Sequence, residues 1–206
     1  MAKKINLFLF FFCFTALSVL ANPEAGLTPH EYEKLKKGEF VIKTGYRAPG
    51  VPEEMGSQIA AIVQIKAPIE RVWNILSDWK SYEHIIPNVQ EIKLIEEEEN
   101  RFLLYFNLSL SVKNIEYYLN YYFFKDKNLV TFQLDQNKKN DFKRFHGYFK
   151  FDPVPENPER VQVVYSVDVE LGKYFPAFIK NYFAKKDMPK VVANLKKWIE
   201  AIKKPL

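Results

Sequence analysis

IKAPIERVWNILSDW, residues 65–79, contains the clearest local structural signals of this 206-residue chain. Pro68 has the fixed backbone geometry that starts a helix. Apolar side chains then recur at the spacing of one helical face, at Ile69, Val72, Trp73 and Leu76. Asp78 ends this helix and has the side chain of an N-cap for a second short helix, Trp79 to Ile86, which Pro87 terminates. The stretch therefore predicts two consecutive short helices.

The spacing of apolar residues changes from segment to segment on both sides of this stretch. Gln58 to Lys66 is a branched, apolar run that predicts a strand. From Val89 to Glu170 apolar and polar residues alternate, which indicates about six successive strands of an antiparallel meander. A wide apolar stripe from Met188 to Ile202 then predicts one long helix, which Pro189 either starts or kinks. An aromatic helical lead-in, Phe175 to Lys186, comes directly before it.

An extension precedes the predicted core. Thr28 and Glu31 flank Pro29 as a capping box, so residues 29–37 should form a short helix. Phe40 to Thr44 predicts a short strand, and Arg47 to Ser57 contains the prolines and glycines of a loop. These features indicate an N-terminal extension at residues 22–57 and a main domain at residues 58–206.

The first 21 residues have the pattern of a secretory signal peptide. Lys3 and Lys4 precede an apolar run from Ile5 to Leu20, and Ala21 supplies a small residue for cleavage. The run is shorter than the roughly 20 residues of a membrane-spanning helix, so an uncleaved anchor is the weaker alternative. We therefore expect an exported protein, periplasmic or secreted, whose only cysteine leaves with the signal peptide.

Composition excludes several classes of protein. Apolar residues make up 48% of the chain and aromatic residues 16%, which excludes general disorder and requires many rings to be buried. The net charge of +5 is too mild for a nucleic-acid partner. The three histidines, His30, His84 and His146, lack metal-ligand spacing, and there is no glycine-rich phosphate loop or nucleophile motif. We therefore expect no metal, no cofactor and no assigned catalytic residue.

The pattern resembles the START-like (SRPBCC) superfamily, in particular its polyketide cyclase/dehydrase and coenzyme Q-binding branch. The resemblance covers about residues 58–203 and begins with residues 65–79, followed by Tyr82 and Pro87-Asn88-Val89. Its second part is Gly147-Tyr148 in one strand and Val164-Tyr165-Ser166 in the next. The signal peptide and the N-terminal extension depart from the well-known members.

The resemblance implies an α+β helix-grip fold. A curved antiparallel sheet of about six to seven strands would wrap around the long C-terminal helix, with two short helices after the first core strand. Members enclose an elongated, mainly apolar cavity between sheet and helix. They bind lipids, sterols, isoprenoid quinones or polyketide intermediates, and a minority catalyse cyclisation. The candidate cavity residues in this chain are Phe106, Tyr117, Tyr121, Phe132, His146, Tyr148, Tyr165, Phe178, Tyr182 and Leu195.

Two of these candidates depend on which face of their strand lines the cavity. Arg144, His146 and Tyr148 share one face, and Phe145, Gly147 and Phe149 share the other. Because one face should meet solvent, an inward phenylalanine face would leave Arg144 and Lys150 solvated. The alternative points His146 and Tyr148 inward, as polar contacts to a ligand or as an acid/base pair.

Two further features have alternative interpretations. Tyr165 stands in a row of valines, either as a core residue whose hydroxyl finds a partner or as a cavity contact. Lysines at positions 180, 185, 186, 190, 196, 197, 203 and 204 make the C-terminal region basic. They form a solvated helix face or, alternatively, a peripheral contact with an anionic membrane surface.

These observations favour an exported binding protein whose partner is a hydrophobic small molecule such as a lipid, an isoprenoid or a quinone. The molecule would lie between the sheet and the C-terminal helix of a carrier or sensor. One alternative is an aromatase/cyclase-type enzyme in which His146, Tyr148 and Tyr165 converge in one pocket. The other is an interaction module whose aromatic residues fill the core.

Overall fold

The computed structural model describes residues 26–55, 59–110, 113–172 and 187–202. Eight strands form one antiparallel sheet in the order β1-β2-β8-β7-β6-β5-β4-β3. The strands are β1 Val41–Thr44, β2 Ile59–Lys66, β3 Val89–Glu98, β4 Arg101–Leu110, β5 Lys113–Phe124, β6 Leu129–Leu134, β7 Phe142–Val154 and β8 Asn157–Leu171. The meander of six strands is confirmed as β3 to β8, and β2 pairs with β8 at its end.

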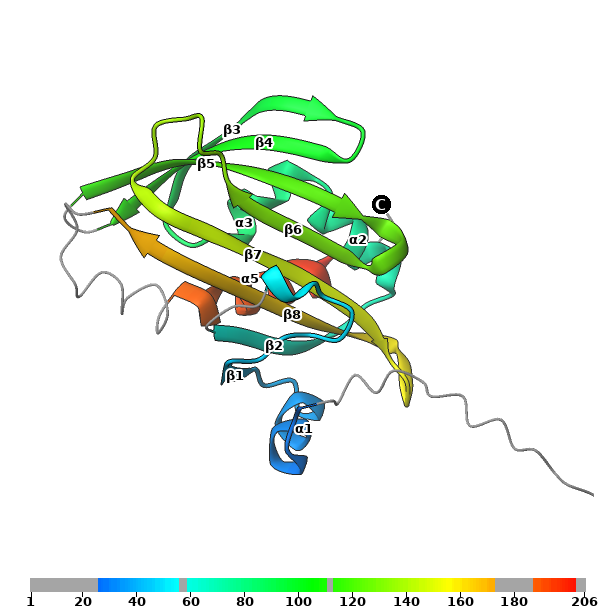
Figure 1. Ribbon diagram of the computed structural model, residues 1–206. Coiled ribbons are helices and arrows are strands. Elements are labelled where there is room, and N and C mark those ends of the chain that lie inside the picture. Colours follow the sequence, from blue (N-terminus) through cyan, green and yellow to red (C-terminus); the bar gives the residue numbers. More distant parts are fainter. Residues whose placement is uncertain (1–25, 56–58, 111–112, 173–186, 203–206) are drawn as a thin grey trace, which may run out of the picture.

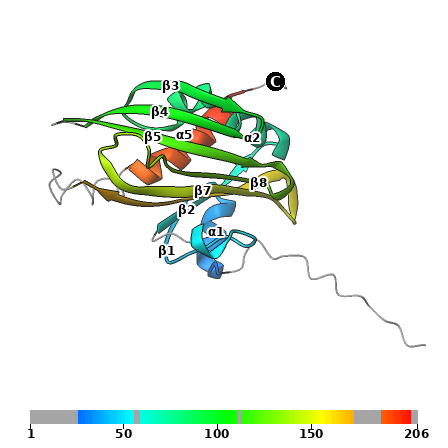
Figure 2. The ribbon, with the colours of Figure 1, turned by 45° about the horizontal axis from the view of Figure 1, so that its top comes forward.

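Most of the described helices gather on one face of the curved sheet (Figures 1 and 2). They are α1 Pro29–Lys36, α2 Ile69–Leu76, α3 Tyr82–Ile85 and α5 Met188–Ala201, with 3₁₀ turns η1 Glu53–Met55, η2 Trp79–Ser81 and η3 Lys125–Lys127. Of these, α2, α3 and α5 lie behind the sheet in Figure 1, whereas α1 lies beyond its β1 end. The arrangement is the α+β helix-grip fold that the sequence predicts.

The local signals correspond to the observed boundaries. Thr28 forms a capping box with Glu31 at the start of α1. The predicted second helix is a 3₁₀ turn followed by the four-residue α3, and the Asp78 side chain accepts a hydrogen bond from the Lys80 backbone N–H. Pro189 lies in the first turn of α5, so it starts this helix. The aromatic lead-in predicted at residues 175–186 lies outside the described residues.

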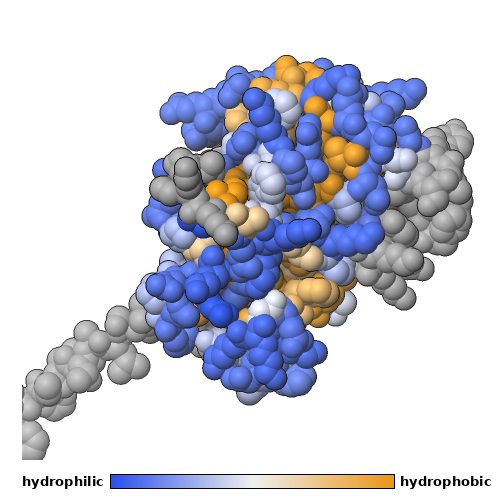
Figure 3. Space-filling model, turned by 180° about the vertical axis from the view of Figure 1, so that it is seen from behind, coloured by the Kyte–Doolittle hydropathy of each residue, from blue (hydrophilic) through white to orange (hydrophobic). Residues whose placement is uncertain are grey.

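The sheet has one strand more than the upper expectation of seven, because the extension joins it. Val41 to Thr44 pair with Ile62 to Ile59 as the antiparallel strand β1. The following loop then folds over the outer face of the sheet, where Tyr46, Ala48 and Val51 are buried. By contrast, α1 has one buried residue, Leu35, and presents a hydrophilic surface at the bottom of Figure 3.

Both faces of β7 are therefore covered near its middle. On the outer face Tyr148 is fully buried and Lys150 is only 8% exposed. The hydroxyl of Tyr148 accepts a hydrogen bond of 3.0 Å from the Ala48 backbone N–H, and Lys150 pairs with Asp152. The expectation that one face of this strand meets solvent is wrong here, because the loop before β2 takes the place of water.

On the inner face, Gly147 makes room for an aromatic ring. A Cβ atom at this position would lie 2.6 Å from Cζ of Phe132 and 2.1 Å from the backbone oxygen of Ser166. Gly147 is also the register partner of Phe132 across the β6–β7 ladder. The Phe132 ring therefore lies over the glycine, and rings of Tyr121, Phe149 and Tyr165 surround it at 5.4, 5.9 and 6.1 Å.

We expect Gly147→Ala to lower the free energy of unfolding by about 3 kcal/mol, because the added methyl group overlaps both a ring and a backbone carbonyl. Denaturant unfolding of the purified variant measures this value. In the double variant Gly147→Ala/Phe132→Leu part of the loss should be relieved, since the ring contact is then removed. An unchanged unfolding midpoint for Gly147→Ala contradicts the account.

We expect Tyr148→Phe to cost about 1–3 kcal/mol of stability, because it leaves the buried Ala48 N–H without its acceptor. Hydrogen exchange at the Ala48 amide should accelerate together with the loss of stability. Tyr118→Phe is the matched control, since Tyr118 lies on the outer face of β5 in a partly exposed position. Equal stability of the two variants would show that the hydrogen bond contributes nothing.

Candidate functional site

A cavity of about 440 Å³ lies between the inner face of the sheet and the start of α5. Most of its wall is apolar, and strands β4 to β8 supply the larger part. The lining residues are Ile59, Ile86, Pro87, Leu108, Tyr117, Leu119, Tyr121, Phe132, Arg144, Phe145, Phe149, Tyr165, Val167, Asp168, Val169, Glu170, Asp187, Met188 and Val191. The volume lies within the range of pockets that hold small organic ligands.

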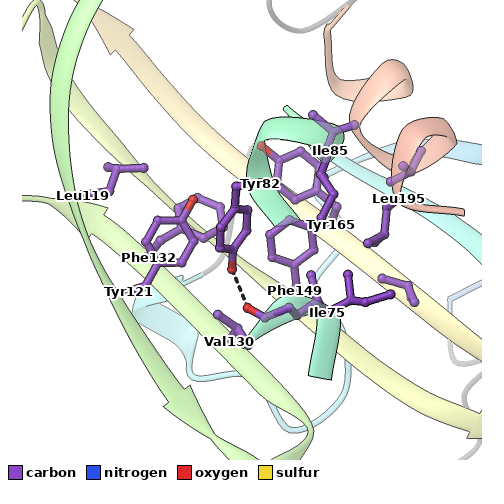
Figure 4. Close-up of a cluster of buried hydrophobic side chains, with 14 of the residues drawn as sticks. Ile75, Tyr82, Ile85, Leu119, Tyr121, Val130, Phe132, Phe149, Tyr165 and Leu195 are labelled. Atoms are coloured by element: carbon purple, nitrogen blue, oxygen red, sulfur yellow. Dashed lines mark hydrogen bonds between the residues drawn. The ribbon is translucent and has the colours of Figure 1, made fainter. Parts of the chain in front are cut away.

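Aromatic rings that pack on one another form the sheet side of this cavity. Tyr117 stacks on Phe106 with ring centroids 5.1 Å apart, and Phe149 stacks on Tyr165 at 4.7 Å. In Figure 4, Tyr121, Phe132, Phe149 and Tyr165 come from four successive strands and point to the same interior. Because these rings pack edge to face and face to face, each ring helps to hold its neighbours in place.

Three tyrosines bring phenol hydroxyls to this apolar wall. Burial raises the pKa values of Tyr117, Tyr121 and Tyr165 well above the ordinary value, so all three phenols are neutral at physiological pH. Among the described residues, none accepts a hydrogen bond from these hydroxyls. By contrast, the buried Tyr82 hydroxyl donates to the backbone oxygen of Leu76 at 2.7 Å (Figure 4).

Four charged residues also belong to the described lining. Arg144 donates to Asp168 at 2.9 Å and to Glu170 at 3.0 Å. Asp187, directly before α5, accepts from the Asn88 side chain at 3.5 Å and lies 4.0 Å from the Lys190 ammonium. The Asp187 carboxylate also contributes to the raised pKa values of Tyr117 and Tyr165, after burial. Because Arg144, Asp168 and Glu170 share the outer face of β7 and β8 with His146, Asp187 is the buried carboxylate of the described lining.

The second half of α5 is fastened to its neighbours. Lys196 Nζ donates to the backbone oxygen of Gln64 at 2.9 Å, and Glu200 accepts from the Lys66 backbone N–H at 2.9 Å. The Trp198 ring stacks on His84 with centroids 3.8 Å apart. The first turns of the helix, with Met188 and Val191, instead line the cavity. Helix α5 is thus anchored at one end and covers the ligand space at the other.

The structure brings four of the candidate residues to the cavity, namely Tyr117, Tyr121, Phe132 and Tyr165. Phe106 and Leu195 are buried in the same hydrophobic core but do not line it. Phe178 and Tyr182 lie outside the described residues.

His146 and Tyr148 do not line the cavity, which corrects the alternative that pointed them inward. Tyr148 is buried under the N-terminal extension, and His146 lies on the same outer face, 3.8 Å from Asp168. Phe145 and Phe149, from the opposite face of β7, take the cavity positions. The alternation of the sequence separated these two sets but could not say which set faced inward.

Asp187 lines the cavity, although no sequence pattern predicts it as a cavity residue. It lies alone among lysines and aromatic residues before the last helix, and no motif marks it. Within the described ranges, no group of histidine, cysteine and carboxylate side chains could hold a metal ion. In the same part of the chain, no helix is both long and apolar enough to cross a bilayer.

Comparison with known proteins agrees with this geometry. Residues 65–196 match the model of the family "Polyketide cyclase / dehydrase and lipid transport". No curated protein matches the sequence.

Solved structures of low sequence identity share the fold. TTHA0849 from Thermus thermophilus is 18% identical, with a TM-score of 0.60 over 70% of this chain and 98% of its own. The STAR-related lipid transfer protein from Xanthomonas axonopodis is 16% identical, with a TM-score of 0.59 over 78% of this chain and 93% of its own. The ZhuI aromatase/cyclase from Streptomyces sp. R1128 is 13% identical, with a TM-score of 0.57 over 67% of this chain and 90% of its own. From the matched residues, the chain belongs to the polyketide cyclase/dehydrase and lipid transport family, and it shares its fold with these solved structures.

Proposed function

We propose that the chain is an exported binding protein that holds one hydrophobic small molecule between the sheet and α5, as a carrier or a sensor. The observation that carries this proposal is the cavity of about 440 Å³ that the aromatic wall leaves open inside the core. An apolar ligand gains roughly 25 cal/mol for each Å² of its surface removed from water, so burial alone can supply the affinity. Lipids, isoprenoids and quinones all have this character.

The cavity separates the proposal from its two alternatives. An interaction module with a filled core would have no such space. An aromatase/cyclase built on His146, Tyr148 and Tyr165 requires these side chains to converge, whereas the first two lie on the outer face of β7. One similar structure is named a lipid transfer protein and another an aromatase/cyclase, so the likeness of fold does not favour either function.

Three of the eight lysines on which the predicted membrane contact rests are described in the structure. Lys196 is used to hold Gln64, while Lys190 and Lys197 on α5 are exposed. Lysines 180, 185, 186, 203 and 204 lie outside the described residues. Contact with an anionic membrane surface stays a prediction, and flotation with liposomes of increasing anionic lipid content tests it.

We expect gently purified protein to contain a hydrophobic small molecule, detectable by mass spectrometry of an organic extract. Val191→Trp should abolish this co-purification, because its side chain lines the cavity and the larger ring fills it. Ala193→Trp is the matched control, since this neighbouring position on α5 is exposed. A folded Val191→Trp protein that retains the same molecule in the same yield would refute cavity binding.

We expect the full-length chain, produced in a bacterial host, to begin at Asn22 once it has left the cytoplasm. Cell fractionation and the intact mass of the purified protein measure this. Replacement of Leu9 by Arg interrupts the apolar run and should leave the unprocessed chain in the cytoplasm. Retention of residues 1–21 in an exported product would point to an uncleaved anchor instead.

A further inference from the structure

The three cavity phenols have a chemical requirement that the apolar wall does not meet. The three side chains, Tyr117, Tyr121 and Tyr165, are each at most 6% exposed. Each has one O–H group, and no described residue accepts a hydrogen bond from it. Their rings lie in one layer, where Phe132 packs against both Tyr121 and Tyr165, and Phe106 against both Tyr117 and Tyr121. The three hydroxyl oxygens are not among the fully buried atoms that lack a partner, so they reach the cavity space, where a ligand that supplies an acceptor oxygen gains a hydrogen bond.

The ionisation state of the phenols fixes the direction of these hydrogen bonds. Burial raises all three pKa values, so the hydroxyls keep their protons at neutral pH and can donate. A phenol O–H donates to a carbonyl oxygen with ordinary geometry, and the hydrogen bond is stronger beside a wall of low polarity than in water. The complementary ligand group is therefore an oxygen acceptor.

The polarity of the lining determines the charge that the ligand can carry. Arg144, Asp168 and Glu170 belong to the lining, but their side chains share the outer face of β7 and β8 with His146, and Asp187 is the other carboxylate residue of the described lining. Arg144 is already paired with both Asp168 and Glu170. Lys190 lies 4.0 Å from Asp187 but does not line the cavity. A ligand carboxylate would thus exchange its hydration for a mainly apolar wall, which is unfavourable.

We propose that the hydroxyls of Tyr117, Tyr121 and Tyr165 select an uncharged apolar molecule with a carbonyl oxygen, in preference to an oxygen-free hydrocarbon or a carboxylate. The inference rests on the proposed function, because it assigns the chemical class of the molecule in the same cavity. The aromatic layer supplies the shape of the site, and the three hydroxyls supply its polar specificity.

A series of three-ring probes tests the proposal on the full mature chain, after extraction of any co-purified molecule. Fluorene and 9-fluorenone differ by the replacement of one CH₂ group with a carbonyl, and fluorene-9-carboxylate adds a negative charge. Equilibrium dialysis with chromatographic quantification gives the three affinities at pH 7.5. One neutral hydrogen bond should make fluorenone about 3- to 10-fold tighter than fluorene, and the carboxylate should bind more weakly than fluorene.

The variants test whether the hydroxyls cause this preference. In the triple variant Tyr117→Phe/Tyr121→Phe/Tyr165→Phe the fluorenone-to-fluorene affinity ratio should fall to about one. The three single variants show which hydroxyl donates. Because both probes are measured on the same protein, any change of stability or cavity shape largely cancels in the ratio. Tyr118→Phe is the control, and its ratio should equal that of the unmodified chain.

The outcomes separate the inference from the proposed function. If fluorene binds but fluorenone has no advantage, or if the advantage persists in the triple variant, the inference is overturned while cavity binding stands. If the carboxylate binds most tightly, the argument from the polarity of the lining is overturned. If none of the three probes binds, both the inference and the proposed function fail. The proposal is supported by a fluorenone preference that disappears with the three hydroxyls.

Discussion

The close approach of the Phe132 ring to the backbone at Gly147 is the constraint on which the rest of the cavity depends. Any side chain at this position would collide with the ring and with the neighbouring strand. The ring can therefore lie flat against the sheet, where Tyr121, Phe149 and Tyr165 pack around it. A ring raised from the sheet would occupy the space that α5 and the wall now enclose. The shape of the cavity thus follows from a missing Cβ atom.

The sheet is the middle layer of the molecule over part of its length. Helices α2, α3 and α5 cover the inner face, and the loop before β2 covers the outer face around Tyr148. The outer cluster includes a directional contact, the hydrogen bond from Ala48 to Tyr148. This second core supports β7 and β8 from behind, at the strands that carry Phe149 and Tyr165. The extension therefore belongs to the support of the aromatic wall.

The helices and strands could be predicted from the sequence, because they depend on local signals. Four cavity residues could be predicted as well, because side chains alternate along a strand. Capping residues such as Thr28 and Asp78 act within one turn and are visible without tertiary structure. The orientation of β7 was not predictable in this way. Both of its faces are buried, so the assumption of one solvated face failed at Tyr148 and Lys150. Asp187 could not be identified either, since only the fold brings it to the cavity.

The hydrogen bonds from α5 to β2 have a consequence for association between molecules. Strand β1 pairs with β2 only from Ile59 to Ile62, so the backbone of the last residues of β2 would otherwise form an open sheet edge. Lys196 and Glu200 occupy backbone groups of Gln64 and Lys66 at that edge. Such an edge is a template for strands of other chains, and charged side chains placed on it prevent aggregation. The helix that covers the cavity thus also shields a strand edge from pairing with other molecules. A truncation that removes α5 should therefore expose the end of β2 to intermolecular strand pairing, as well as opening the binding site.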